Sequence, residues 1–233
     1  QGVVLTAFHH KNCTNIQGAT IQNNNLAAMS AINASGSNMR FFGVDYCVDA
    51  PYVEESQDRF KDNHMMGLNR AVDAEEALSS LSIVNQNEES IDQLADVQNM
   101  MWMDVPVDNM VSDLALTHYD MLILSPFSSD PPASIDDVYT IQGLKSKPDS
   151  EAKRLVLAYM DIGVAVEGAF YWTWSTPPNW IDQPVADNDP RYRTKYWRDE
   201  WLIILKDMVD AIFNAGFDGI VFGGIDALDG YQN

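Results

Sequence analysis

The chain has 233 residues and a hydrophobic fraction of 46%, enough for one sizeable core and too much for a largely disordered protein. A formal net charge of −20 repels phosphate backbones and anionic lipid surfaces, so nucleic acid is not expected as a partner. No apolar run reaches about 18 residues, and membrane insertion is not expected either.

The first part of the chain, residues 1–93, is predicted to be an N-terminal extension. Clusters of β-branched and aromatic residues predict strands over residues 3–8 and 39–46. Apolar residues at helical spacing predict helices over residues 21–32 and 69–83, with a polar acidic loop before the second.

The second part, residues 94–233, alternates strand and helix patterns, which is typical of a parallel sheet with crossover helices. Strands are predicted over residues 100–105, 119–124, 155–160 and 219–222, and helices over residues 107–117 and 197–214. The last helix has an apolar stripe, and Gly216 stands where a helix commonly ends. The expected fold class is α/β.

The cysteines and acidic loops leave few options for metals or cofactors. Cys13 and Cys47 are the only cysteines, and one disulfide between them or two buried free thiols are both consistent with the sequence. The acidic loops at residues 130–137 and 182–189 lack the spacing of a calcium-binding EF-hand. No nucleotide or zinc motif is present, so we expect no metal and no cofactor.

Four motifs cluster in the second part: KRLVLAYMDIGVAVEGAFYW (153–172), PPNW (177–180), YRTKYWRDEW (192–201) and AGFDGIVFGGIDA (215–227). Together they resemble the endo-α-1,4-polygalactosaminidases, a TIM-barrel group of glycoside hydrolases once labelled cysteinyl-tRNA synthetase-related. The resemblance covers about residues 94–230. It implies a (β/α) TIM-barrel-like domain and a secreted or cell-surface location.

The resemblance also predicts that the barrel is incomplete or open. Members of the family usually continue past GFDG for several more strands and helices, whereas this sequence stops at Asn233. A longer parent protein, closure by the strands at 3–8 and 39–46, and cover from a neighbouring chain are the three explanations. Because an open barrel edge invites strand pairing, we expect self-association or a partner chain there.

The residues that the family uses for chemistry are substituted. Its acidic positions at three strand ends correspond here to Ser125, Val164 and Gly223, and a second acid of the motif that contains Val164 corresponds to Val166. Hydrolysis of a glycosidic bond needs two carboxyl groups at the ends of barrel strands. The resemblance therefore implies a degenerate, non-catalytic glycosidase-like protein. The alternative is a hydrolase of amino-sugar polymers that uses relocated acids, Asp161 and Asp226, although capping of helices or hydrogen bonding to loops is the favoured interpretation of both.

The aromatic residues of the motifs are retained. Flat aromatic faces stack against the apolar faces of sugar rings, so five are predicted to bind carbohydrate: Tyr171, Trp172, Trp180, Tyr196 and Trp197. Packing of the loops against the barrel rim is the alternative for each. The expected function is an extracellular carbohydrate-binding or structural assembly subunit.

Overall fold

The computed structural model is a mixed α/β structure with parallel sheets. It describes residues 3–7, 10–11, 15–16, 27–29, 31–32, 39–46, 50–70, 83–103, 105–106 and 111–225. The chain divides into two compact units. Unit 1 comprises Gln1–Trp102, Met110–Leu122 and Leu144–Leu155, and unit 2 comprises Met103–Asn109, Ile123–Gly143 and Val156–Asn233. No helix within the described residues is long and apolar enough to cross a membrane.

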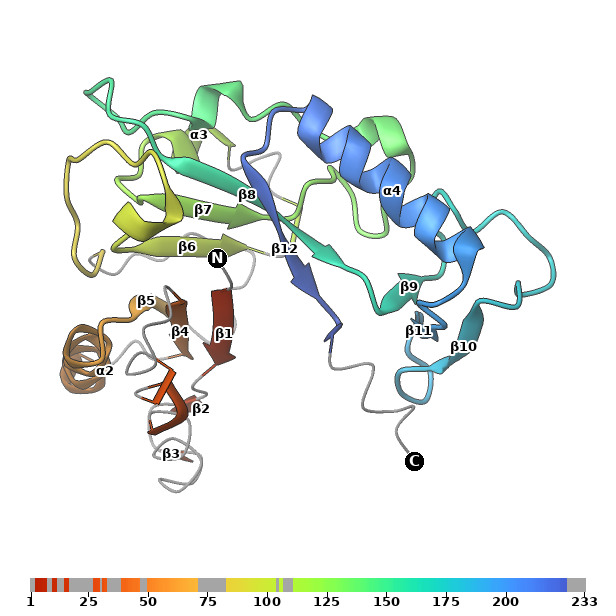
Figure 1. Cartoon of the computed structure of the whole chain (residues 1–233), viewed down its shortest axis with the longest axis horizontal. Helices are drawn as coiled ribbons and strands as arrows, with labels where there is room; N and C mark the ends of the chain where they lie inside the picture. The colour runs from red at the N-terminus through yellow and green to blue at the C-terminus, as the bar shows by residue number, and fades with distance from the viewer. Residues whose placement is uncertain are drawn as a thin grey trace. The chain divides into compact units, whose positions relative to one another are not determined.

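Unit 1 contains a parallel sheet of three strands in the order β1-β4-β5 (Figure 1). The strands are β1 (Val3–Ala7), β4 (Arg40–Tyr46) and β5 (Met66–Arg70), and α2 (Ala50–Asp62) connects the last two. Strands β2 (His10–Lys11) and β3 (Asn15–Ile16) form a short antiparallel pair. The strands predicted at 3–8 and 39–46 are confirmed, and residues 27–29 and 31–32 of the predicted helix at 21–32 are helical.

The predicted polar loop after residue 46 is wrong, because that segment forms α2 and then β5. Among the α2 residues whose burial is described, 51–62, those buried are Val53, Ser56 and Phe60, at spacings of three and four, so few apolar residues of this helix stand out in the sequence. The helix predicted at 69–83 is contradicted at its start, where residues 69 and 70 end β5. Residues 71–82 lie outside the described residues.

Phe60 explains why two glycines stand in this sheet. A Cβ atom at Gly43 of β4 or at Gly67 of β5 would overlap the Phe60 ring. The ring therefore lies directly on the backbone of both strands, and Phe41 and Met65 belong to the same core cluster. At the other end of β4, the buried Asp45 carboxylate accepts hydrogen bonds from Ser56 and Arg59 of α2.

A second sheet has the strand order β12-β8-β7-β6. Figure 1 draws the arrows of β6, β7 and β8 in one direction, and β12 pairs in parallel with β8. The strands are β6 (Met100–Met103), β7 (Met121–Leu124), β8 (Leu155–Asp161) and β12 (Gly219–Gly223). All four predicted strands are confirmed. Every residue of β7 is buried, whereas β8 alternates between buried and half-buried residues.

Shorter elements connect these strands. The predicted helix at 107–117 is α3 (Val111–Ala115) in its described part, and three single turns of 3-10 helix are η1 (Leu94–Asp96), η3 (Ile135–Asp137) and η4 (Gln142–Leu144). Arg154 is almost fully buried and donates hydrogen bonds to the carbonyl oxygens of Leu114 and Ala115, which end α3. A cation at this position satisfies carbonyl groups that a helix cannot bond internally.

Unit 2 adds an antiparallel sheet that the sequence did not predict. Its strands, in the order β10-β11-β9, are β9 (Val164–Val166), β10 (Ile181–Pro184) and β11 (Arg191–Thr194). The predicted helix at 197–214 is α4 (Asp199–Asn214), which buries Trp201, Met208 and Ile212. Gly216 follows it with φ of +100°, a left-handed conformation that favours glycine, as predicted for the helix end.

Candidate functional site

A cavity of about 820 Å³ opens in unit 2. Its lining comes from the segment after β7, the last residues of β8, strand β9 and the hairpin tip between β10 and β11. Ligand sites of parallel α/β sheets form beyond the carboxyl ends of the strands, because the connecting loops meet there. The cavity lies where this class of fold places its chemistry.

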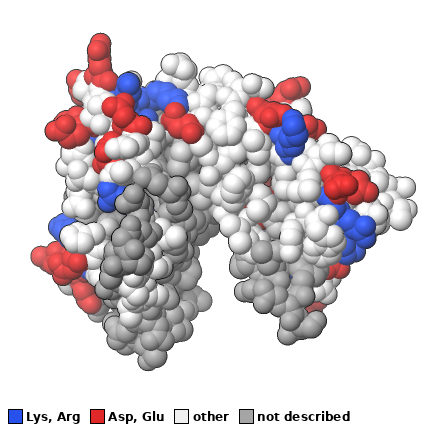
Figure 2. Space-filling model, viewed as in Figure 1, with Lys and Arg blue, Asp and Glu red and all other residues white. Residues whose placement is uncertain are grey.

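Acidic side chains dominate the charge of the cavity. Asp130, Asp161, Asp187 and Asp189 line it, and Arg191 is the basic residue among the lining residues. Figure 2 shows the same imbalance on one face of the molecule, where acidic groups are more numerous than basic ones among the described residues. Four carboxylates against one guanidinium favour a cationic ligand over an anionic one.

Arg191 and Asp189 fix the hairpin tip that forms one wall. The Arg191 Nε and Nη2 atoms donate to the two carboxylate oxygens of Asp189 over 2.9 and 2.7 Å. These hydrogen bonds lower the pKa of Asp189 and raise the pKa of Arg191. A two-point contact of this kind holds both side chains in one plane, so the wall is ordered before a ligand arrives.

Tyr171 supplies a neutral polar group at the cavity. Its hydroxyl oxygen accepts a hydrogen bond from the Val166 backbone over 3.0 Å, and the residue is only 8% exposed. The pKa of Tyr171 is raised to about 12, mainly by burial; the hydrogen bond from Val166 acts in the opposite direction, and the charges of Asp161 and Asp130 add to the rise. Tyr171 therefore keeps its proton at neutral pH and can donate it to a ligand oxygen or nitrogen.

Asp161 lines the cavity and also supports the local backbone. Its Oδ1 atom accepts a hydrogen bond from the Gly163 backbone over 3.1 Å, in the turn from β8 to β9. Gly224 has φ of +68°, and a Cβ atom there would overlap the Asp161 carboxylate. The Asp161 carboxylate thus hydrogen-bonds to a loop, which is one of the roles considered for it above. Asp226, the predicted partner of Asp161, lies outside the described residues.

Three of the positions that the resemblance predicts to be substituted line this cavity, namely Ser125, Val164 and Val166. The fourth, Gly223, is not in the lining and pairs with Asp161 in the β12–β8 register. At these three lining positions the cavity carries one hydroxyl group and two isopropyl groups.

The predicted aromatic residues do not share one surface. Tyr171 is the one of the five that lines the cavity. Trp180 is 2% exposed and stacks on Trp201, with ring centroids 4.7 Å apart. Trp172 is half-buried and packs against the rings of Trp174 and Tyr192. The remaining two, Tyr196 and Trp197, are 39% and 49% exposed and form an edge-to-face pair away from the cavity lining.

Four residues of the cavity lining were not predicted as site residues from the sequence. Asp130, Asp187 and Asp189 belong to the two acidic loops at residues 130–137 and 182–189, and Arg191 begins β11 just beyond the second loop. The negative charge of the loops was visible in the sequence, but no sequence pattern indicated that the two loops meet at one cavity. Cys13 and Cys47 lie outside the described residues. Within the described part of the chain, no group of three or more His, Cys, Asp or Glu residues is placed to hold a metal ion.

Comparison with known proteins shows partial similarity to uncharacterised proteins, and no protein-family model matches the chain. A protein of Methanocaldococcus jannaschii is 32% identical over 82 residues, covering 34% of this chain and 24% of the relative. A protein of Thermotoga maritima is 34% identical over 76 residues, covering 31% and 24%. A protein of Deinococcus radiodurans is 25% identical over 120 residues, covering 49% and 36%. The chain therefore spans a quarter to about a third of the length of these curated relatives.

Proposed function

We propose that this protein is a non-catalytic, extracellular relative of glycoside hydrolases that binds carbohydrate in the acidic cavity of unit 2. One observation carries the proposal: the cavity lies beyond the carboxyl ends of β7 and β8, and Ser125, Val164 and Val166 line it where the resembled family has acids. The cavity could therefore still hold a sugar, whereas Ser125, Val164 and Val166 lack the carboxyl groups that would transfer protons at those positions.

The strand order supports a TIM-barrel-like fold. In each of the two parallel sheets the strands follow one another in chain order, as β1-β4-β5 and as β6-β7-β8-β12. A doubly wound sheet reverses its strand order at the point where ligands bind, whereas a (β/α) barrel does not. Sequential order therefore favours the barrel.

The charge of the cavity favours sugars that carry amino groups. An ammonium group on the ligand would be attracted by Asp130, Asp161 and Asp187, and the Tyr171 hydroxyl would donate to a ring or hydroxyl oxygen. Neutral sugars would lack the first of these contributions. We therefore infer that an α-1,4-linked galactosamine oligomer binds more tightly than its N-acetylated, uncharged counterpart.

A hydrolase is the second candidate, because Asp130 and Asp161 line the same cavity and both act on the pKa of Tyr171. Two carboxyl groups at one site are the minimum that glycoside hydrolysis requires. The alternative that Asp161 works with Asp226 also stays a prediction.

The exposed apolar edge at β12 supports a role in assembly with other chains. Phe222 is 46% exposed and Ile225 is 55% exposed at this strand and just beyond it, and β12 pairs with β8 alone among the described strands. An apolar sheet edge of this kind favours pairing with another chain. Self-association of the purified protein, measured by light scattering and weakened in Phe222→Ser, would support it.

The binding proposal is tested by calorimetric titration of the protein with galactosamine oligomers and with their N-acetylated forms. Asp130→Asn should weaken binding of the charged oligomer by about tenfold, because it removes one charge-assisted contact. Asp113→Asn, which changes an exposed carboxylate on α3 in unit 1, is the matched control and should leave the affinity unchanged.

The same samples, assayed for new reducing ends, separate binding from catalysis. The non-catalytic proposal expects none. Release of reducing ends by the parent protein, abolished in Asp161→Asn, would establish the hydrolase instead. Equal or absent binding of the charged and uncharged oligomers would remove the cavity from consideration as an amino-sugar site.

A further inference from the structure

Unit 1 holds a second cavity, of about 280 Å³, whose charge is opposite to that of the molecule. Its lining includes Arg40, Lys61 and His64, and no carboxylate of the described residues lines it. In a chain with 14 Lys and Arg against 34 Asp and Glu, such a lining stands out from the average surface. We propose that this cavity binds a small oxyanion, a phosphate or sulfate group, either free or as the head of a small ester.

Arg40 is the fixed donor of the site. It begins β4, and its Nη2 atom donates a hydrogen bond to the carbonyl oxygen of Ala95. That contact orients the guanidinium group, which has five N–H donors in a planar fork. Planar forks of this kind bind the oxygens of phosphate and sulfate through paired hydrogen bonds.

Lys61 and His64 approach the cavity from the end of α2. His64 has φ of +53°, and its backbone N–H donates to the Lys61 carbonyl, so it lies in the left-handed turn that ends the helix. Lys61 has an ion pair with Asp58, but the atoms are 3.9 Å apart and both side chains are at least half exposed. Such a pair is weak and leaves the ammonium group able to bind another anion.

The carbonyl groups at the end of α2 do not oppose an anion at this place. The Arg59, Phe60 and Lys61 carbonyl oxygens already accept hydrogen bonds from the backbone of residues 63, 65 and 64 respectively. The partial negative charge that a helix C-terminus normally presents is therefore reduced by internal bonds.

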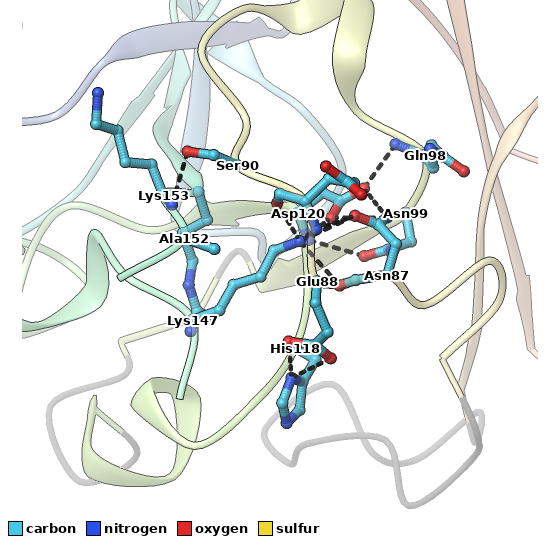
Figure 3. A network of polar contacts seen from close by, with 12 residues as sticks. Asn87, Glu88, Ser90, Gln98, Asn99, His118, Asp120, Lys147, Ala152 and Lys153 are labelled. Atoms are coloured by element: carbon cyan, nitrogen blue, oxygen red, sulfur yellow. Dashed lines mark hydrogen bonds and ion pairs between the residues drawn. The ribbon is translucent and has the colours of Figure 1, made fainter. Parts of the chain in front are cut away.

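Two further lining residues, Gln98 and Asn85, are held by a buried network, part of which is drawn in Figure 3. Gln98 lines the cavity, and its backbone N–H donates to the Asp120 Oδ2 atom over 2.8 Å. Asn85, also in the lining, accepts a hydrogen bond at its carbonyl oxygen from Asn99 over 3.0 Å. Lys147 neutralises Asp120 over 2.7 Å, so the network orders this part of the lining without placing a net negative charge behind it.

The number of donors favours a tetrahedral oxyanion over a simple carboxylate. Three basic side chains, one from the start of β4 and two from the end of α2, line the cavity, which suits a ligand with three or four oxygens. The volume lies just below the usual range for drug-sized ligands, about 300 to 1,000 Å³, and therefore fits a free anion or a short ester. This inference is independent of the proposed carbohydrate site, which lies in unit 2.

Calorimetric titration of the full chain at low, constant ionic strength tests the proposal with inorganic phosphate, sulfate, glycerol phosphate and acetate. Phosphate and sulfate should bind saturably and acetate more weakly. Tighter binding of glycerol phosphate than of inorganic phosphate would assign the ester. Lys61→Gln should weaken binding by about five- to tenfold because it removes a charged donor, and His64→Asn should weaken it because it removes the imidazole ring. Asn tolerates the left-handed conformation, so His64→Asn preserves the turn.

Lys153→Gln is the matched control, since Lys153 is exposed, pairs with Asp92 and is absent from the cavity lining. No saturable binding of phosphate, sulfate or the ester by the parent protein would overturn the proposal. An equal loss of affinity in Lys153→Gln and Lys61→Gln would do so too, because it would indicate a diffuse charge effect. Acetate binding as tight as that of phosphate would overturn the assigned ligand class. Lys61 is half exposed, so its variant remains decisive even if His64→Asn is unstable.

Discussion

Lys147 and Asp120 form an ion pair of 2.7 Å in which both side chains are completely excluded from solvent. The ammonium group also donates to the carbonyl oxygens of Asn87 and Glu89, over 2.9 and 2.8 Å. Because all of these groups are bonded, the pair is tolerated in a buried place where either charge alone would be very costly.

Breaking this pair should therefore destabilise the protein strongly. Lys147→Met leaves the Asp120 carboxylate buried without a counter-charge, and we expect a loss of about 3 to 5 kcal/mol in the free energy of unfolding. Urea denaturation measures it. Lys153→Met is the control: its ion pair with Asp92 is exposed on both sides, and the expected loss is at most about 1 kcal/mol. Equal losses in free energy of unfolding in the two variants would contradict the expectation that the buried Lys147–Asp120 pair is costlier to break than an exposed pair.

The contact of Phe60 with the strands of unit 1 predicts a steric effect. Gly67→Ala places a methyl group inside the Phe60 ring, and overpacking of this kind costs about 1 to 3 kcal/mol. The thermal midpoint of unfolding should fall, and Phe60→Leu in the same chain should recover part of it by vacating space. Gly143→Ala is the control, because a Cβ atom there meets nothing within 4 Å. A stable Gly67→Ala variant would show that Phe60 can move away.

The buried phenol of Tyr119 predicts a loss of stability at high pH. Burial raises its pKa from 10.0 to about 12. The raised pKa contributes stability that is complete below pH 10.0 and is lost as the pH rises to about 12, since the unfolded chain ionises first. Tyr119→Phe removes this contribution, on the order of 2 to 3 kcal/mol, so its free energy of unfolding should fall less steeply over this range.

Urea denaturation at a series of alkaline pH values checks the Tyr119 prediction. Tyr171 has a pKa raised in the same way, so Tyr119→Phe should retain part of the pH dependence and the double variant with Tyr171→Phe should retain less. Tyr52→Phe, at a position that is 39% exposed, controls for the loss of one hydroxyl group. Identical alkaline profiles for the parent protein and Tyr119→Phe would refute the assignment.

The positive charge of Arg191 should oppose the binding of a cationic ligand in the acidic cavity. Arg191→Gln removes the basic residue of the lining and releases Asp189 from its two hydrogen bonds. A galactosamine oligomer should then bind about two- to fivefold more tightly, because one repulsive charge has gone and one carboxylate has been freed. Stability should change little, since the ion pair is largely exposed on the Arg191 side. Weaker binding in Arg191→Gln would instead make the guanidinium a direct ligand of the sugar.

The sequence predicted those strands and helices whose buried face is formed by a short, regular pattern of apolar residues. The run Met121–Leu124 is apolar throughout and forms a strand buried on both faces. The stripe of α4 and the glycine that ends this helix were both visible at helical spacing. In contrast, the buried residues of α2 within 51–62 are Val53, Ser56 and Phe60, and the Phe60 ring packs where Gly43 and Gly67 of the neighbouring strands have no side chain.

The sequence by itself determined the acidic charge, the two strands at residues 3–8 and 39–46, and the four strands of the second sheet. Only the tertiary structure decided which charged groups meet. Asp130, Asp161 and Asp189 line one cavity, whereas Arg40 and His64 line another. These groupings depend on loops that the sheets bring together, and electrostatic energy depends on distance through space. No pattern of neighbouring residues in the chain encodes that distance.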